Sequence, residues 1–352
     1  MIKYPAEIEL LSDDAGEASD VDAGSDLWFL PGPPEEEHDF LPPLPRAEPD
    51  EASVIQDWRL AEAARASHLA RTAARLGALD DRLLRGPKGW RHRLALMEAA
   101  ELGWFAGARI SPDRLALWIA LRSGNADEDS PSMSKVGWAF RRLSGGPGPI
   151  ADLAAFLGRH ETGASGDEAT LGDRIGGLTQ MMAQSGDLHP LTRSCLGFAL
   201  WPMAGIEQEG ERLEAGVTAA RLAATECRGG AVFAPMAIGG AGGLRAGGDP
   251  AKRLKLWLDG IENGVIAAMR QLDLLEDWRV KAEVATADLS GRTPILLVQA
   301  LIEWPLLSAP MAEGITGASR AAVQRNLTLM EDRKLVREVT GQGRFRFWRC
   351  AL

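Results

Sequence analysis

The chain has 352 residues, 45% of them apolar and 25% charged, which is enough material for two or three domains with buried cores. No apolar run reaches the roughly 18 residues that a membrane span needs, and the N-terminus lacks the pattern of a signal peptide, so we expect a cytoplasmic protein without membrane contact. The net charge of −10 hides an asymmetry: residues 1–51 hold fifteen acidic and two basic residues, whereas residues 316–352 hold eight basic and three acidic ones. A polyanion should therefore be attracted through the C-terminal end.

Residues 1–51 predict an acidic, proline-rich arm. They hold 8 of the 20 prolines, and proline prevents a continuous helix or a central strand. Their low apolar content favours a disordered or extended segment. The alternative is an arm laid over the rest of the protein and held there by Trp28 and Phe40. Whether it is disordered or packed, the acidic arm could bind a protein partner or contact another part of the same chain.

Apolar residues at helical spacing predict a helical body after this arm. We expect a first helix over residues 54–76 that ends at Gly77, and further helices over residues 90–105, 112–121, 134–143, 150–157, 168–184, 190–200, 211–226 and 250–287. The break Gly145-Gly-Pro-Gly-Pro149 favours a boundary between subdomains. We therefore divide the chain into the arm (1–51), an N-terminal helical subdomain (52–146), a central helical domain (147–288) and a C-terminal domain (289–352).

Three stretches of the body allow two interpretations each. The apolar stripe of residues 250–287 fits a buried core better than a dimer seam. The glycine-rich residues 239–248 fit a flexible connector, because they lack the spacing of a dinucleotide- or nucleotide-binding loop that would cradle a phosphate. The basic residues around Trp90, from Lys88 to Arg93, fit a solvated helix start better than an auxiliary contact to a polyanion.

The C-terminal domain predicts a winged helix-turn-helix. A first helix over residues 294–303 is followed by a short helix that starts at Ser308, a turn at Gly317, and a helix from Arg320 to about Lys334 that Ser319 caps. A strand over residues 335–339, a hairpin tip over 340–343 and a return strand over 344–349 complete the pattern. Within the return strand we expect Phe345 and Phe347 on the buried side, and Arg344, Arg346 and Trp348 on the outer side.

The third helix of this domain would carry the contacts to DNA. Val323, Leu327 and Met330 form its buried stripe. The outer face would enter the major groove, and Arg344 and Arg346 of the wing would hold phosphates or the minor groove. The predicted DNA-binding residues are therefore Ser319, Arg320, Gln324, Arg325, Thr328, Arg344 and Arg346. The alternative is a domain of the same fold that binds proteins.

Residues 310–349, which begin Pro310-Met-Ala-Glu-Gly-Ile-Thr-Gly-Ala-Ser-Arg, resemble the C-terminal helix-turn-helix of an uncharacterised alphaproteobacterial family. That family is best known from rhizobial plasmids and joins this module to a helical domain of unknown function. The similarity extends upstream through residues 94–122, Leu188-His-Pro-Leu-Thr-Arg193 and Leu254-Lys-Leu-Trp-Leu-Asp-Gly-Ile261, and thus covers residue 47 to the end. The resemblance implies DNA binding and assigns no reaction.

A weaker resemblance, carried by the same His189 and Leu254 segments and the trailing winged helix, links the body to Fic proteins. These transfer AMP with a histidine in a loop of the form His-Pro-Phe-x-(Asp/Glu)-Gly-Asn-Gly-Arg. The corresponding stretch here reads Trp201-Pro-Met-Ala-Gly205, so the general base and the glycine-rich anion site are both missing. This departure implies a catalytically inactive Fic-like scaffold rather than an active transferase.

No other pattern predicts catalysis or a cofactor. The five histidines lack the spacing of metal ligands, and the three cysteines (Cys195, Cys227 and Cys350) are far apart without a Cys-x-x-Cys motif. We therefore expect a non-enzymatic, sequence-specific DNA-binding protein without metal or cofactor, most consistent with a transcriptional regulator that binds double-stranded DNA as a homodimer. The alternative is a replication, partition or scaffold protein of a mobile replicon.

Overall fold

The computed structural model describes residues 51–121, 131–158, 170–206, 212–341 and 346–352. By internal contacts the chain divides into residues 1–48 and 49–352. The predicted acidic arm therefore lies outside the described residues, apart from its last residue, Glu51. The finer boundaries predicted after residues 146 and 288 stay predictions.

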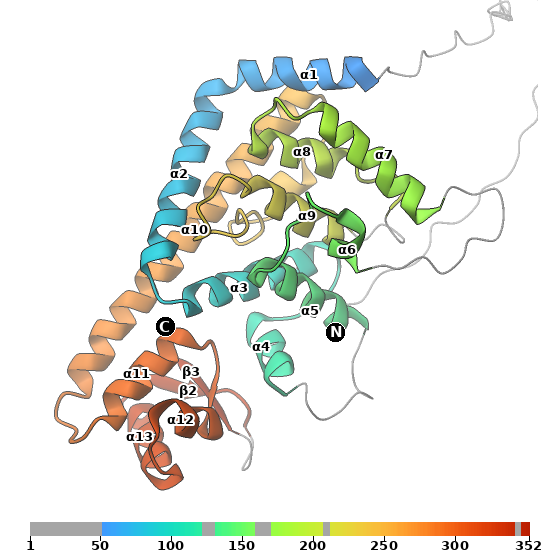
Figure 1. The fold of residues 1–352 in the computed structure, drawn as a ribbon. Helices are drawn as coiled ribbons and strands as arrows, with labels where there is room; N and C mark the ends of the chain where they lie inside the picture. The colour runs from blue at the N-terminus through green and yellow to red at the C-terminus, as the bar shows by residue number, and fades with distance from the viewer. Residues whose placement is uncertain (1–50, 122–130, 159–169, 207–211, 342–345) are drawn as a thin grey trace, which may run out of the picture. The chain divides into compact units, whose positions relative to one another are not determined.

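The described part of the chain is mainly helical, as predicted, with thirteen α-helices and a small antiparallel sheet near the C-terminus (Figure 1). The helices are α1 (Glu51–Ala64), α2 (Ala66–Arg85), α3 (Gly89–Phe105), α4 (Pro112–Leu121), α5 (Pro131–Ser144), α6 (Leu153–Leu157), α7 (Leu171–Gln184), α8 (Pro190–Leu200), α9 (Leu213–Ala223), α10 (Pro250–Ala285), α11 (Thr293–Glu303), α12 (Ala309–Thr316) and α13 (Arg320–Asp332). The strands are β1 (Leu307–Ser308), β2 (Val336–Glu338) and β3 (Phe347–Cys350). None of the described helices has the length and apolar character that a membrane crossing requires.

The start of the body differs from the prediction of one helix that ends at Gly77. The helix breaks at Arg65, and α2 continues to Arg85 before Gly86 and Pro87 end it. Gly77 is exposed within α2. The helix continues through this glycine because the residues on both sides, including Leu76 and Leu79, are buried where α2 packs along α10. Burial of this apolar face outweighs the cost of about 1 kcal/mol for a glycine inside a helix.

Helix α10 confirms the interpretation of its apolar stripe as core. Asp249 caps the helix, since its carboxylate accepts a hydrogen bond from the Lys252 amide at 2.9 Å. The stripe residues Leu254, Leu258 and Ile261 are fully buried, and α10 packs against α1, α2, α8 and α11. These neighbouring helices of the same chain therefore cover the apolar stripe where they contact α10.

The segment of residues 228–249 is packed in part. Within the predicted connector, residues 239–248, Gly243 and Leu244 are buried and most of the other residues are exposed, so its flexibility stays a prediction. Phe233, Met236 and Leu244 are buried, and the segment holds the 3₁₀ helix η2 (Gly243–Arg245). Glycine is required where the segment crosses α10, because a Cβ at Gly264 would overlap the carbonyl of Pro235. The glycines therefore allow two backbones to approach closely.

Two buried carboxylates from distant helices hold this segment. Glu98 of α3 accepts hydrogen bonds from the amides of Met236 (2.9 Å), Ala237 (2.9 Å) and Ile238 (3.1 Å). Asp80 of α2 accepts the amides of Arg228 (2.8 Å) and Ala231 (2.7 Å). The amides of residues 236–238, just before the predicted connector, are thus bound to a carboxylate of the chain itself.

Candidate nucleic-acid interface

Residues 293–352 form the C-terminal module, in which α12, a turn and α13 follow one another as predicted. Ser308 caps α12 through the Met311 amide at 3.3 Å, and Ser319 caps α13 through the Ala322 amide at 3.3 Å. Gly317 ends α12 in the left-handed region, with φ of 65°. These three residues set the directions of the two helices from local sequence signals alone.

The sheet of the module has the strand order β1-β3-β2, and all pairs are antiparallel. The predicted strands correspond to β2 and β3, whereas β1, which pairs Leu307 with Trp348, is an addition. The Glu338 carboxylate holds the start of the hairpin tip, since it accepts the amides of Thr340 (2.7 Å) and Gly341 (3.0 Å). Residues 342–345, which include the rest of the tip and the predicted DNA-binding residue Arg344, lie outside the described residues.

Trp348 corrects the predicted orientation of the return strand. Phe347 is buried as expected, but Trp348 is also buried, with only 3% of its surface exposed. Its indole N–H donates to Glu331 of α13 at 3.4 Å, and the guanidinium of Arg346 lies 4.9 Å from the ring centroid. Burial does not alternate along β3, because Arg346 and Glu331 of α13 contact the side chain of Trp348 on the face that was expected to be exposed.

Helix α13 has one buried and one exposed face, as predicted. Val323, Leu327 and Met330 are fully buried. The exposed side chains include the five residues that the sequence places on the outer face: Ser319, Arg320, Gln324, Arg325 and Thr328. The structure thus brings these five together on one surface. Arg346 lies just before β3, and its guanidinium donates a hydrogen bond to Glu331 of the same helix.

Ion pairs inside the protein take up much of the basic charge of the module. Arg320 pairs with Glu313 at 2.8 Å and Arg346 with Glu331 at 3.1 Å, whereas Arg333 and Arg349 pair with Asp288 (2.7 Å) and Asp113 (3.4 Å) outside the module. The hydrogen bond to Glu313 raises the pKa of Arg320. Within the described residues no ion pair engages the other basic side chains of the module, which are Arg325, Lys334 and Arg337.

Gln324, Arg325 and Thr328 make no side-chain hydrogen bond to any described residue, although all three are exposed. An amide, a guanidinium and a hydroxyl thus lie on one helix face with their donors and acceptors available. Glutamine and arginine can each make two parallel hydrogen bonds to a base edge in the major groove. The chemistry of this face therefore fits recognition of base pairs.

Arg93 of α3 joins the module to the body, a role that the sequence did not indicate. Its guanidinium donates to the carbonyls of Leu301, Ile302 (3.3 Å) and Trp304 (2.6 Å), at the C-terminal end of α11. Burial lowers the pKa of this guanidinium. Trp90 is buried as well, so the interpretation of residues 88–93 as a solvated helix start is wrong for these two side chains.

Trp201, at the position where the resemblance to Fic proteins would expect a histidine, lies in the core with 1% of its surface exposed. His189 lies at the N-terminus of α8, where its Nδ1 accepts a hydrogen bond from the Leu191 amide at 3.1 Å. Burial raises the pKa of the three cysteine thiols, Cys195, Cys227 and Cys350, and thus disfavours the reactive thiolate. In the part of the chain that the structure describes, no group of histidine, cysteine and acidic side chains could hold a metal ion.

No protein-family model matches the chain, and no curated protein is similar to it. The functional interpretation therefore depends on the residues and the geometry described above. Of the seven predicted DNA-binding residues, Gln324, Arg325 and Thr328 are exposed and unengaged, Ser319 caps its own helix, and Arg320 and Arg346 are ion-paired.

Proposed function

We propose that residues 289–352 form a winged helix-turn-helix that binds double-stranded DNA sequence-specifically, and that the protein acts as a transcriptional regulator. The order of α12, turn, α13 and β-hairpin supports this proposal. The observation that carries it is the exposed face of α13, where Gln324, Arg325 and Thr328 lie opposite a fully buried apolar stripe and have no partner among the described residues. The helical body, in this proposal, is an inactive Fic-like scaffold.

Each polar residue of α13 has a defined role in this proposal. Arg325 pairs with the two acceptors of a guanine, and Gln324 with the donor and acceptor of an adenine. Ser319 and Arg320, at the N-terminus of the helix, contact phosphates, which a helix N-terminus also attracts. Arg344 and Arg346 hold the backbone next to the wing.

The protein binds its site as a dimer in this proposal, because one winged helix contacts few base pairs. A two-fold arrangement of the protein places two α13 helices on half-sites that are about 34–36 Å apart, or a multiple of this distance. The operator should accordingly be an inverted repeat.

Genome-wide mapping of the bound DNA, followed by binding measurements on the mapped site, tests the proposal. Arg325→Ala should weaken binding to the mapped site by about 1–3 kcal/mol, or roughly 5–150-fold, and relax the preference at one base pair. Arg270→Ala is the matched control, because it removes an exposed helical arginine of α10 outside the module. Wild-type affinity in a folded Arg325→Ala protein would contradict base recognition by this face.

The mapped position also distinguishes the two roles on DNA. A regulator binds within promoters and changes their output, whereas a replication or partition protein binds at an origin. Failure to enrich any DNA, together with a folded module, would favour a protein-binding domain of the same fold.

A further inference from the structure

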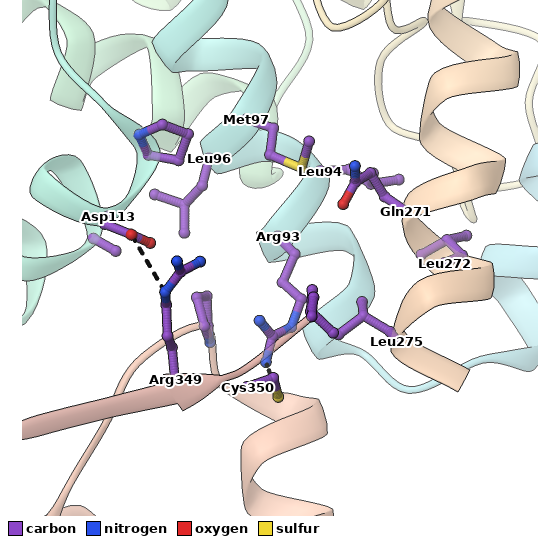
Figure 2. A pocket seen from close by; sticks show the side chains of 14 residues that line it. Arg93, Leu94, Leu96, Met97, Asp113, Gln271, Leu272, Leu275, Arg349 and Cys350 are labelled. Atoms are coloured by element: carbon purple, nitrogen blue, oxygen red, sulfur yellow. Dashed lines mark hydrogen bonds and ion pairs between the residues drawn. The ribbon is translucent and has the colours of Figure 1, made fainter. Parts of the chain in front are cut away.

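An apolar cavity of about 250 Å³ lies where the body meets the C-terminal module (Figure 2). Helices α3, α4 and α10 contribute the body side, and β3 with the residues after it contributes the module side. Two parts of the chain that are far apart in sequence therefore line the cavity. A molecule bound there would touch both.

The walls of the cavity are mostly hydrocarbon. Leu94 of α3 and Leu272 and Leu275 of α10 are buried, and Met97 and Ala116 add further apolar surface. An apolar protein cavity of about 150 Å³ is large enough to bind benzene. The present cavity thus has room for a single ring or a short alkyl chain that carries a polar group.

The polar side of the cavity carries two guanidinium groups. Figure 2 shows Arg93, which extends from α3 toward Cys350 of the module, and Arg349 on β3, with Asp113 above Arg349. Arg349 Nε lies 3.4 Å from Asp113 Oδ2, an ion pair without hydrogen-bond geometry, and this nitrogen has no hydrogen-bond partner. The two side chains are 34% and 47% exposed, so the pair is accessible from solvent.

A carboxylate is the group that fits this polar side. A guanidinium presents two parallel N–H donors to a carboxylate, and such charge-assisted bonds are roughly twice as strong as neutral ones. Asp113 occupies this role only loosely, so a ligand carboxylate can replace it on Arg349. A cationic ligand would instead meet both Arg93 and Arg349.

We propose that this cavity binds a small organic acid, with its apolar part between Leu94, Leu272 and Leu275 and its carboxylate on Arg349. Binding at this place regulates DNA binding, a step that rests on the function proposed above. Arg349 follows Trp348 in β3, and the indole of Trp348 bonds to Glu331 of α13. Trp348 and its hydrogen bond to Glu331 therefore connect the ligand site to the helix that is proposed to bind DNA.

Calorimetric titration with hexanoate, octanoate and phenylacetate, each beside its neutral amide, tests the binding site. At least one acid should bind ten times more tightly than its amide. Arg349→Met should abolish that preference, and Ala116→Leu, which fills the cavity, should abolish binding of both forms. Arg114→Met, which removes an exposed arginine of α4 outside the cavity, should change neither. No acid bound at millimolar concentration, or equal affinity for acid and amide, would overturn the site.

The affinity of full-length protein for its mapped DNA, with and without the acid that binds best, tests the regulation. The acid should change the DNA affinity at least fivefold, and the DNA should change the acid affinity by the same factor, because coupling between two sites is reciprocal. An acid that binds through Arg349 but leaves DNA affinity unchanged would overturn the regulatory step. Acid binding in a protein that binds no DNA would refute the proposed function while the site itself stands.

Discussion

Replacing Glu98 with glutamine should change how the stability of the protein depends on pH. The Glu98 carboxyl group is fully buried and accepts three backbone amides of the glycine-rich segment. Burial raises its pKa from 4.5 to about 7, because the loss of hydration outweighs the three hydrogen bonds, which favour the charged form. Glutamine has nearly the same shape and cannot ionise in this range.

The direction of the effect follows from the protons bound in each state. Between pH 4.5 and about 7 the folded protein keeps a proton on Glu98 that the unfolded chain has lost, so the free energy of unfolding falls as the pH rises. The contribution is fully present below pH 4.5 and is lost as the pH passes through about 7. A shift of this size corresponds to about 3 kcal/mol at roughly 1.4 kcal/mol per pKa unit.

Urea denaturation of wild-type protein and Glu98→Gln at intervals from pH 5 to pH 8 measures this effect. From pH 5 to pH 8 the free energy of unfolding of wild type should fall by about 2–3 kcal/mol more than that of the variant. This expected difference in slope does not depend on the constant offset in stability between the two proteins. That offset includes one unpaired amide, because the glutamine NH₂ faces a backbone donor. Glu226→Gln, at an exposed glutamate, should follow wild type at every pH. A constant difference between wild type and Glu98→Gln would refute the buried, proton-binding carboxyl.

Three further predictions concern packing and charge. Gly264→Ala should destabilise the protein by several kcal/mol in thermal denaturation, because the new Cβ meets the Pro235 carbonyl. Gly77→Ala, with open space around the new Cβ, should instead stabilise the protein by up to about 1 kcal/mol. Equal effects of the two substitutions would contradict the close approach at α10. Trp278→Phe removes a buried 2.7 Å hydrogen bond to the Leu335 carbonyl, which still accepts a hydrogen bond from the Ala351 amide. We therefore expect the free energy of unfolding to fall by about 1–2 kcal/mol and hydrogen exchange in the module to become faster. Unchanged exchange would show that this bond does not hold the module. Deletion of residues 1–51 should tighten non-specific DNA binding most at low salt, where charges are least screened. Unchanged affinity at low salt after the deletion would exclude competition by the acidic arm.

Local signals predicted much of the fold. Helix α8 matches its predicted bounds because Pro190 is favoured in the first turn and His189 caps it through Leu191. In the module, the caps at Ser308 and Ser319 and the left-handed Gly317 each act over three or four residues. Such signals depend only on neighbouring sequence, so a single sequence is enough to identify them.

Long-range contacts account for what the sequence could not show. Glu98 binds amides about 140 positions away, and Arg93 binds carbonyls 208 to 211 positions away. No periodicity or spacing indicates which buried carboxylate meets which loop. The same reason explains the error at Gly77, because the partner that holds α2 helical there is α10. The buried position of Trp348 likewise depends on β1, a two-residue strand too short to leave a pattern.

The ion pairs change how the charge of the module should be counted. A sum over residues 316–352 treats all eight basic side chains as available to DNA, yet four of them already have carboxylate partners. A phosphate that binds Arg320 or Arg346 must compete with Glu313 or Glu331, so the net gain is smaller than for a free arginine. Arg325 has no such competitor among the described residues. In the proposed complex with DNA, its full charge would therefore be available at the base edge. The paired arginines would favour DNA only where the phosphate geometry is better than that of their internal partners.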